Sequence, residues 1–503
     1  MAQQVELKKT LSLTGVTMNA MALIAPGAFL WLTFQLQAAQ VNSSGGTTAM
    51  DMFAGLVLAL ILAFLTAISY SKLSEIYPEA GTGTSYYFAE KAFMDEPSKL
   101  SVFSRIVKFI VGWFSHLYYW IYPGVMVAMM ATLITYILGQ FGLVVPIFGQ
   151  ILIAVVFAAL TGAVAYRGIN GSTISSIVIN VIQIVTLVFV TILAIIYRVQ
   201  NPQHVQFVHQ SFTSIIIPHS LANVLFQSTI AILLLVGFES ATALAGESKS
   251  PKHVSRGVIL SLVIQGLICY LLEYAGALSW INTSYTVSGK TGLDAAAASS
   301  APIGDMVRIL GDTLLNNTGF FLMVVVAISV AIAVFGTTLA CMNTGIRVTY
   351  AMAKDSEMPS VLGMLHHKHA TPHTAVWTIT IVSAIVGAIG VISITNLTAV
   401  TLVSNIGTFV LYGMTNLISL IAFMRHPKRN PITHIVVPIL GLLANIGMLL
   451  AVIYLGILGG GATQTAAIAA IIATVVWMLI GIVYLVTNSK KQGRRIIAVK
   501  SLS

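Results

Sequence analysis

The fold of this chain is decided by the stretch Ser228-Thr-Ile-Ala-Ile-Leu-Leu-Leu-Val-Gly-Phe-Glu-Ser-Ala-Thr-Ala-Leu-Ala-Gly246, in which one carboxylate stands among apolar side chains. A run this apolar is expected to cross a membrane, where a central charge costs about 3 kcal/mol even on translocon scales. Beside Glu239, Gly237 and Ser240 loosen a helix that lipid would otherwise require to be continuous. The charge and the helix break together predict a binding site at mid-membrane.

The whole chain has the composition of an integral membrane protein. Of its 503 residues, 57% are hydrophobic and only 8% are charged, with a mean hydropathy of +0.92, whereas soluble domains carry about 25% charged residues. The first ten residues are too polar for a signal peptide, so the first spanning helix is expected to act as its own insertion signal. Both cysteines, Cys269 and Cys341, lie in apolar segments, and no disulfide framework is implied.

The apolar runs predict an all-α membrane protein with twelve transmembrane helices. Their expected ranges are 13–38, 52–74, 105–138, 147–166, 173–197, 220–246, 256–281, 318–350, 374–394, 398–423, 434–457 and 464–487. Residues 1–503 would form a single transporter domain, with a first repeat at 13–197, a second at 220–423 and two additional helices at 434–487. A short helix is expected near Pro302 to Leu310, in the largest external loop.

The positive charges predict the orientation of these helices. With the N-terminus placed in the cytoplasm, all but three of the 25 Lys and Arg residues lie on the cytoplasmic side or at its helix ends, the exceptions being Arg198, Lys290 and Arg308. This positive-inside pattern predicts an even number of helices and two cytoplasmic termini, in a plasma membrane or bacterial inner membrane. The net charge of +10 is therefore interpreted as a topology signal beside membrane lipids, and we predict no nucleic-acid partner.

A second interrupted segment suggests internal symmetry. Pro26 and Gly27 lie at the middle of the first predicted helix, and Gly237 lies at a similar depth in the sixth. Interrupted hydrophobic segments at corresponding places in two halves indicate a transporter built from inverted repeats. We therefore predict a five-plus-five inverted repeat with discontinuous helices 1 and 6. The alternative is an ordinary kink at Pro26 and a close-packing glycine at Gly237.

The broken helices would supply the binding groups through their backbone. N–H groups from Gly27 to Phe29 begin a half-helix and suit a carboxylate. Carbonyl groups of Leu23 and Ile24, and of Val236 and Gly237, would accept hydrogen bonds from an ammonium group. The pattern predicts an α-amino acid, whose two charges lie on one carbon.

Three buried side chains are candidates for proton coupling: Glu239, Glu273 and His116. Glu239 has three open roles, which are to carry the proton, to pair with a cationic substrate, or to hold the break in shape. Glu273 either binds a proton or is a carboxylate hydrogen-bonded near the external vestibule. His116 titrates in the physiological range, or it simply bonds a neighbouring helix.

Other chemistry is weakly supported by the sequence. Thr337 and Thr338 offer adjacent hydroxyls as weak sodium ligands, although back-bonding within their own helix is the favoured interpretation. Gly81-Thr-Gly83 lacks the Lys-Ser/Thr of a phosphate loop. Without a nucleophile triad or His/Cys ligand spacing, we predict no enzyme activity, no cofactor and no resident metal.

The segment Gly237-Phe-Glu-Ser-Ala-Thr-Ala-Leu-Ala-Gly-Glu-Ser-Lys-Ser-Pro-Lys252 resembles the helix 6 signature of the amino acid–polyamine–organocation transporters. In the same order as in that family, the chain also carries Glu75-Ile-Tyr-Pro-Glu-Ala-Gly-Thr-Gly83, Tyr166-Arg-Gly168 and Arg347-Val-Thr-Tyr-Ala-Met-Ala-Lys-Asp355. The resemblance covers positions 13 to about 425. It implies an amino acid permease that works by alternating access.

The resemblance also assigns roles to residues. It implies that substrate carboxylate meets Ala25, Pro26, Gly27 and Ala28, with the amino group beside Val236, Gly237, Phe238 and Glu239. It implies a cytoplasmic gate in which Arg347 and Lys354 pair with Glu75 or Glu79. Two positions depart from relatives within the family: Leu233 replaces a gating Trp of arginine–agmatine antiporters, and Gln183 replaces a proton-switching Lys. These departures favour a smaller or apolar substrate side chain and exclude a Lys switch.

The function predicted from the sequence is therefore secondary amino acid transport, proton-coupled or by exchange. The alternative is a polyamine or amine transporter, or an amino acid/amine antiporter. A channel or a nutrient sensor on the same fold is less favoured, because the chain shows neither a ring of charges nor a signalling domain. An amino acid or amine is the expected small-molecule partner, and the sequence makes no prediction of oligomeric state.

Overall fold

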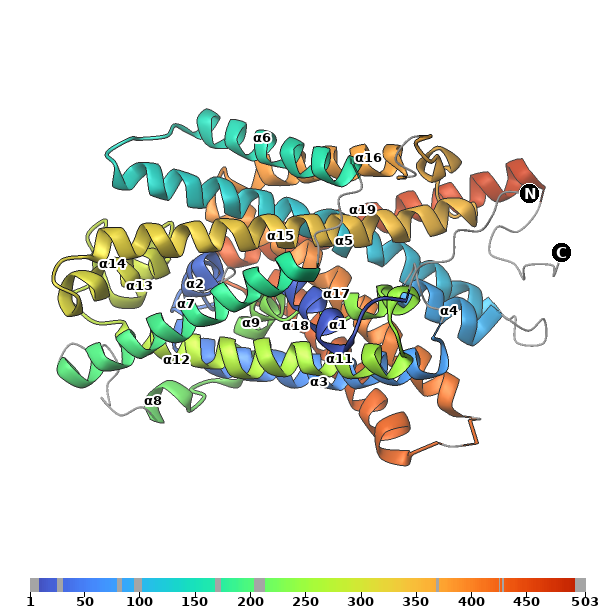
Figure 1. Cartoon of the computed structure of the whole chain (residues 1–503), viewed down its shortest axis with the longest axis horizontal. Coiled ribbons are helices and arrows are strands. Elements are labelled where there is room, and N and C mark those ends of the chain that lie inside the picture. Colours follow the sequence, from blue (N-terminus) through green and yellow to red (C-terminus); the bar gives the residue numbers. More distant parts are fainter. Residues whose placement is uncertain are drawn as a thin grey trace.

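The computed structural model describes residues 9–24, 30–78, 84–94, 102–167, 173–202, 213–367, 371–424, 426–427 and 429–493. Long helices run side by side along one axis (Figure 1). Within the described residues, ten helices are long and apolar enough to cross a membrane. This confirms the all-helical membrane class. Two more predicted spans, the first and the sixth, are present as shorter helical pieces.

The long spans follow the predicted ranges closely. They are α3 (Met52–Ile76), α5 (Val102–Gln140), α6 (Ile147–Tyr166), α7 (Thr173–Gln200), α11 (Pro251–Leu262) continued by the π-helical η6 (Val263–Tyr270) and α12 (Leu271–Trp280), α15 (Gly319–Lys354), α16 (His373–Gly390), α17 (Ile394–Met424), η8 (Ile432–Val436) with α18 (Val437–Leu458), and α19 (Gly461–Gln492). The seventh span begins five residues before its predicted start, because Ser250 caps it and Pro251 occupies its first turn. The ninth ends at Gly390 rather than at residue 394.

The first and sixth spans are interrupted. The first consists of α1 (Leu13–Ile24) and α2 (Leu30–Ala38), and residues 25–29 between them lie outside the described part of the chain. The sixth consists of α9 (Leu221–Ala231), a 3-10 turn at Ile232–Leu234, irregular turns, α10 (Ser240–Ala243) and a 3-10 turn at Ala245–Glu247. Gly237 has a φ of +126°, a conformation open essentially to glycine alone. The break at Gly237 therefore follows directly from the local sequence.

Short elements cover the two ends of the bundle. They are η1 (Ala49–Asp51), α4 (Ser85–Met94), α8 (Thr213–Ile216), β1 (Thr286–Val287), β2 (Lys290–Thr291), α13 (Gly292–Ala298), α14 (Pro302–Leu314) and η7 (Ser360–Gly363). The short helix predicted near Pro302 to Leu310 is present as α14, whereas α4, α13 and the small hairpin were not expected. Helices α13 and α14 lie at one end, and α4 lies at the other with the end of α19 (Figure 1).

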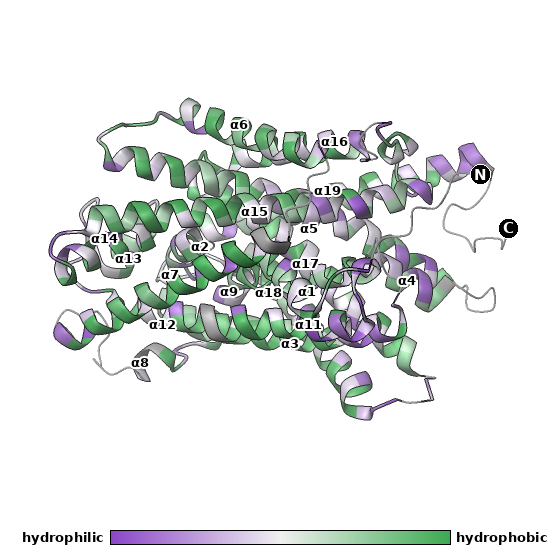
Figure 2. Cartoon of the chain, viewed as in Figure 1, coloured by the Kyte–Doolittle hydropathy of each residue, from purple (hydrophilic) through white to green (hydrophobic). Residues whose placement is uncertain are grey.

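Hydropathy follows this arrangement. The middle of the bundle is largely apolar, and hydrophilic residues gather toward its two ends (Figure 2). Many large apolar side chains on α6, α7, α18 and α19 are exposed, such as Val185 at 62% and Leu443 at 59%. Such an exposed apolar surface would be unstable in water and is expected of a surface in lipid.

Helix α5 packs against α15, α16 and α17. Small residues let these helices approach closely: a Cβ atom at Gly407 would lie 2.8 Å from the backbone nitrogen of Tyr118. In lipid the hydrophobic effect does not drive helices together, and glycines at helix contacts stabilise the packing by allowing close van der Waals contact. As a result, tyrosines of α5 are buried next to α17.

Candidate functional site

The two interrupted spans meet at Gly237. A Cβ atom there would lie 2.9 Å from the Cδ2 atom of Leu23 and 3.0 Å from the backbone nitrogen of Ile24. The loosened part of the sixth span therefore lies directly against the end of α1, as a shared site requires. Ala25, Pro26, Gly27 and Ala28 lie outside the described residues. Their contact with a substrate carboxylate stays a prediction.

Glu239 is fully buried beside this contact. Its Oε2 atom accepts hydrogen bonds from the backbone N–H of Gly237 at 2.9 Å and from the hydroxyl of Tyr412 at 2.8 Å. Hydrogen bonds to a carboxylate are among the strong ones in proteins. The Gly237 bond is the one needed to hold the break in shape. The Oε1 atom accepts no hydrogen bond of ordinary geometry from the described residues, although Tyr118 lies within electrostatic range.

The carbonyl groups at the break already have protein donors. The Ile24 carbonyl accepts from the hydroxyl of Tyr270 at 3.1 Å. The Gly237 carbonyl accepts from the backbone N–H and the hydroxyl of Ser240, at 3.0 and 2.6 Å. Two of the carbonyls expected to receive an ammonium group are therefore engaged in this state. A carbonyl has two lone pairs, so each keeps one acceptor position.

Aromatic rings surround Glu239, and two of them, Tyr70 and Tyr412, were not predicted from the sequence. The ring of Phe238 lies 5.2 Å from that of Tyr412 and 6.0 Å from that of Tyr70, and the two tyrosine rings are 6.0 Å apart, all between ring centroids. A carboxylate among aromatic faces suits a cationic group. The available signal was tyrosine at the middle of an apolar span, since a buried phenol must find a partner.

The other two proton candidates lie elsewhere. Glu273 in α12 is 4% exposed, and its Oε2 atom has no hydrogen-bond partner among the described residues. His116 is buried with Nδ1 3.0 Å from the Gly112 carbonyl and Nε2 3.2 Å from the hydroxyl of Thr349. Its environment is the one expected of a histidine that joins two helices.

The two threonines proposed as sodium ligands behave differently. Thr337 donates to the carbonyl of Ala22 in α1 at 2.9 Å, so α15 does reach the first span. Thr338 donates to Val334 in its own helix at 2.7 Å, as expected from back-bonding. Within the described residues, no group of three or more His, Cys, Asp or Glu side chains is arranged to hold a metal ion.

The proposed gate residues have partners other than those expected. Arg347 donates to the Ala243 carbonyl at 3.2 Å and lies 3.6 Å from the carboxylate of Glu247, at the end of the sixth span. Glu75 instead contacts Lys72 at 3.0 Å and accepts from Ser255 at 2.7 Å. The pairing of Arg347 with Glu75 is therefore corrected, because the end of the sixth span carries the nearer acid. Lys354 lies 5.4 Å from the Tyr350 ring centroid, and Glu79 lies outside the described residues.

A buried lysine cluster at this end was missed. The Nζ atom of Lys108 lies 3.2 Å from Glu90, 3.1 Å from Asp355 and 3.1 Å from Glu357, joining α4, α5 and the segment after α15. Tyr86 donates to Asp355 at 2.8 Å and to Glu357 at 2.9 Å. Burial raises the pKa of Glu357, and the charge of Lys108 opposes that rise. The signal in the sequence was a lysine within an apolar helix, which we counted only as a helix-end charge.

Backbone hydrogen bonds also tie the two interrupted spans together at this end. The N–H groups of Thr10 and Leu11 donate to the Glu247 carbonyl at 2.9 Å each, and Lys249 donates to the Leu11 carbonyl at 2.9 Å. The approach to α1 and the end of the sixth span are therefore joined just outside the helical bundle.

Comparison with known proteins agrees with this arrangement. Residues 9–486 match the family described as Amino acid permease. The chain is 21% identical over 361 residues to the branched-chain amino acid permease BcaP of Bacillus subtilis (strain 168), covering 68% of this chain and 69% of that protein. It is 26% identical over 391 residues to the low-affinity putrescine importer PlaP of Escherichia coli (strain K12), covering 76% and 74%. With the match running over nearly its whole length, this chain belongs to the amino acid permease family of membrane transporters.

Proposed function

We propose that this permease carries amino acids across a plasma membrane or bacterial inner membrane by alternating access. The observation that carries the proposal is the contact between the end of α1 and the broken sixth span at Gly237, beside the buried Glu239. Two helix interruptions that meet away from water can offer backbone groups to a charged solute, and the carbonyl groups here each keep one acceptor position. No comparable backbone receptor is needed in a helix that only spans lipid.

The architecture that we propose around this site has twelve transmembrane helices with both termini in the cytoplasm. Repeats at 13–197 and 220–423 would be inverted relative to each other, and 434–487 would be additional. Amides of residues 25–28 would hold the substrate carboxylate. Val236, Gly237 and Phe238 would lie beside the amino group, with Glu239 close enough to attract it.

The cytoplasmic closure would be formed by the ion pairs at the end that carries α4. Arg347 joins α15 to the sixth span through Glu247, and Lys108 joins α5 to Asp355 and Glu357. Opening toward the cytoplasm would require these contacts and the Leu11 backbone bonds to separate. Glu75, Glu79 and Lys354 are proposed as secondary members of the same closure.

Transport in proteoliposomes tests the function. Purified protein would first be screened against amino acids, amines and polyamines for thermal stabilisation, because a ligand that binds only the folded state raises the melting temperature. Uptake of radiolabelled leucine, chosen for the similarity to BcaP, would then be measured with unlabelled competitors. Leucine should compete, whereas N-acetylleucine and 3-methylbutylamine, which lack the free amino group or the carboxylate, should not.

A second candidate function is amine transport, and the surroundings of Glu239 favour it specifically. No described residue donates a hydrogen bond of ordinary geometry to the Oε1 atom of Glu239. The carboxylate also lies among the rings of Phe238 and Tyr412, and this arrangement suits an ammonium group. The similar protein PlaP is a low-affinity putrescine importer. Unimpaired uptake of putrescine, with no stabilisation by amino acids, would select this function over the first.

A further inference from the structure

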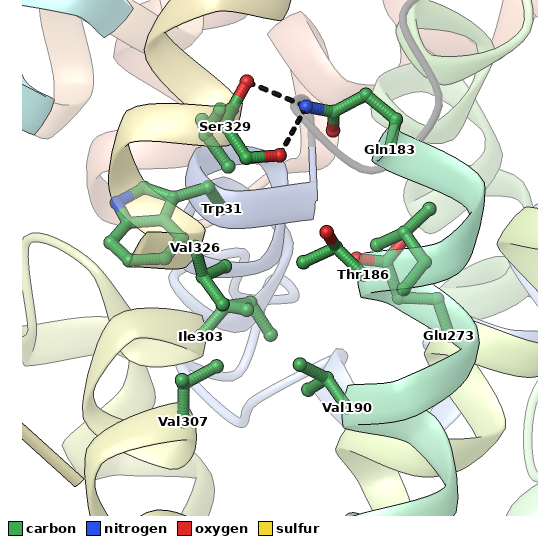
Figure 3. A pocket seen from close by; sticks show the side chains of 11 residues that line it. Trp31, Gln183, Thr186, Val190, Glu273, Ile303, Val307, Val326 and Ser329 are labelled. Carbon is green, nitrogen blue, oxygen red and sulfur yellow. Dashed lines mark hydrogen bonds between the residues drawn. The ribbon is translucent and has the colours of Figure 1, made fainter. Parts of the chain in front are cut away.

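A small cavity lies beside Glu273, away from the contact between the two broken spans. It is bounded by α2, α7, α12, α14 and α15, and its lining includes Trp31, Gln183, Thr186, Ile303 and Val326. Figure 3 shows Glu273 on the α7 side of the cavity with Thr186, across from Trp31, Ile303 and Val326. The cavity measures about 10 Å³, which is room for about one water molecule.

Glu273 faces this cavity without a partner. It is 4% exposed, and its Oε2 atom receives no hydrogen bond among the described residues. The nearby amide of Gln183 is turned away, since its nitrogen donates to the carbonyl and hydroxyl of Ser329, both at 2.5 Å. A carboxyl group with a bare oxygen at the edge of a water-sized space is well placed to exchange a proton.

The described residues that line the cavity carry no positive charge that would offset a negative charge on Glu273. Among the described residues that line the cavity, Glu273 is the one acid or base. Its neighbour Tyr274 donates its hydroxyl to Gln37. The packed elements carry their other titratable groups outside the lining: Asp51 before α3, Tyr70, Lys72 and Glu75 on α3, Tyr197 and Arg198 on α7, Tyr270 on η6, Asp305, Arg308 and Asp312 on α14, and Cys341, Arg347, Tyr350 and Lys354 on α15. An isolated carboxylate in such surroundings neutralises by binding a proton.

Glu239 and Glu273 differ in the hydrogen bonds that they receive, and this difference indicates different roles. Glu239 receives an N–H and a phenol O–H, and donors of this kind stabilise a charged carboxylate. Glu273 has neither. Helix α14 supplies Ile303 and Val307 to the lining and packs on α2 and α15, so a displacement of α14 would open the cavity on that side.

We propose that Glu273 is the coupling site of this permease, where a proton from the external solution binds on Oε2 through the cavity water. A hydronium ion gives its proton to the carboxylate, which leaves the neutral carboxyl group and one water molecule. Glu239 stays with the substrate. This proposal rests on the transport function and orientation given above, and it narrows coupling to one of two buried acids.

Infrared spectroscopy of the purified protein tests proton binding without any substrate. A pH titration should show the C=O band of a buried protonated carboxyl group in the wild type. In a Glu357→Gln background, which removes another buried acid, whose pKa is raised by burial, that band should be lost in Glu273→Gln and kept in Glu239→Gln. A band that persists in Glu273→Gln, or one that disappears only in Glu239→Gln, would overturn the assignment.

Proteoliposome uptake of leucine and of putrescine tests coupling. An inward gradient of one pH unit supports accumulation of about tenfold per proton. Glu273→Gln should reduce this to simple equilibration while exchange of internal for external substrate continues. Retained accumulation would refute the coupling role. If neither probe enters with the wild type, the transport proposal fails, and the infrared result still decides Glu273.

A cavity-filling pair covers the case in which Glu273→Gln does not fold. Val326→Leu adds a methylene group to the lining and should slow proton uptake at Glu273, whereas Val325→Leu changes the preceding, 45% exposed residue and should not. Equal rates of proton uptake in the two variants would contradict a water-filled route through this cavity.

Discussion

Two buried acidic regions of this permease are stabilised by opposite means. At the broken sixth span, neutral donors from Gly237 and Tyr412 hold Glu239. At the lysine cluster, one ammonium group from Lys108 holds Glu90, Asp355 and Glu357. Neutral donors bring no opposite charge to a carboxylate, whereas the ammonium group that lies 3.1 Å from Glu357 does. The region around Glu239 is therefore suited to binding a ligand, and the cluster around Lys108 is suited to holding helices together in a closed state.

Removing the lysine should have the largest effect. Lys108→Met leaves three carboxylates together in a buried site, and breaking a buried ion pair by deleting one partner costs about 3–5 kcal/mol of stability. We expect a large loss of folded, monodisperse protein and a lower melting temperature in detergent. Lys108→Arg keeps the charge and serves as the control. A melting temperature equal to that of the wild type would break the distinction between the two regions.

Next in size is the backbone at the break. Gly237→Ala places a Cβ atom on a residue with φ of +126° and within 3.0 Å of the Ile24 backbone, and such strain costs about 1–3 kcal/mol. We expect weaker ligand-induced thermal stabilisation and a lower melting temperature. Gly336→Ala is the matched control, because a Cβ atom there meets nothing within 4 Å. Equal behaviour of the two variants would show that the break tolerates a side chain.

The Tyr412 donor should matter more for binding than for folding. Tyr412→Phe removes one of the two hydrogen bonds to the Oε2 atom of Glu239, a net loss of about 0.5–1.5 kcal/mol, while the aromatic ring remains against Phe238. Ligand affinity measured by calorimetry should change, with only a small shift in melting temperature. Tyr70→Phe is the control, because the hydroxyl that it removes is hydrogen-bonded to Ser85 and not to Glu239. If the two variants alter affinity equally, Tyr412 has no special role.

The smallest effect concerns pH at the lysine cluster. Because burial raises the pKa of Glu357, this group contributes stability that is fully present below its unfolded value of about 4.3 and that is lost as pH rises through the folded value. Glu357→Gln should therefore gain in melting temperature relative to the wild type between acid and neutral pH, while keeping an acceptor for Tyr86. A constant difference across that range would remove Glu357 from the pH response.

Local features of the molecule were predictable from sequence. The span at 147–166 agrees to the residue with α6, and the external helix at Pro302 is present as α14. The break at Gly237 was also recognisable, because a glycine beside a charge interrupts an apolar run. In contrast, the contact of Arg347 with Glu247 was not predicted and the cluster around Lys108 was overlooked, since each joins residues that are far apart in the chain.

Sequence alone determined the membrane class, the positions of the apolar spans and the interruption of the sixth span. These follow from transfer of side chains into lipid and from backbone preferences, which act within a few residues. Only the tertiary structure decided which acid receives donors, which receives a lysine and which faces a cavity. Glu239, Glu357 and Glu273 are the same residue type in a largely apolar chain. Their differences arise from groups on other helices, such as Tyr412, 173 residues from Glu239.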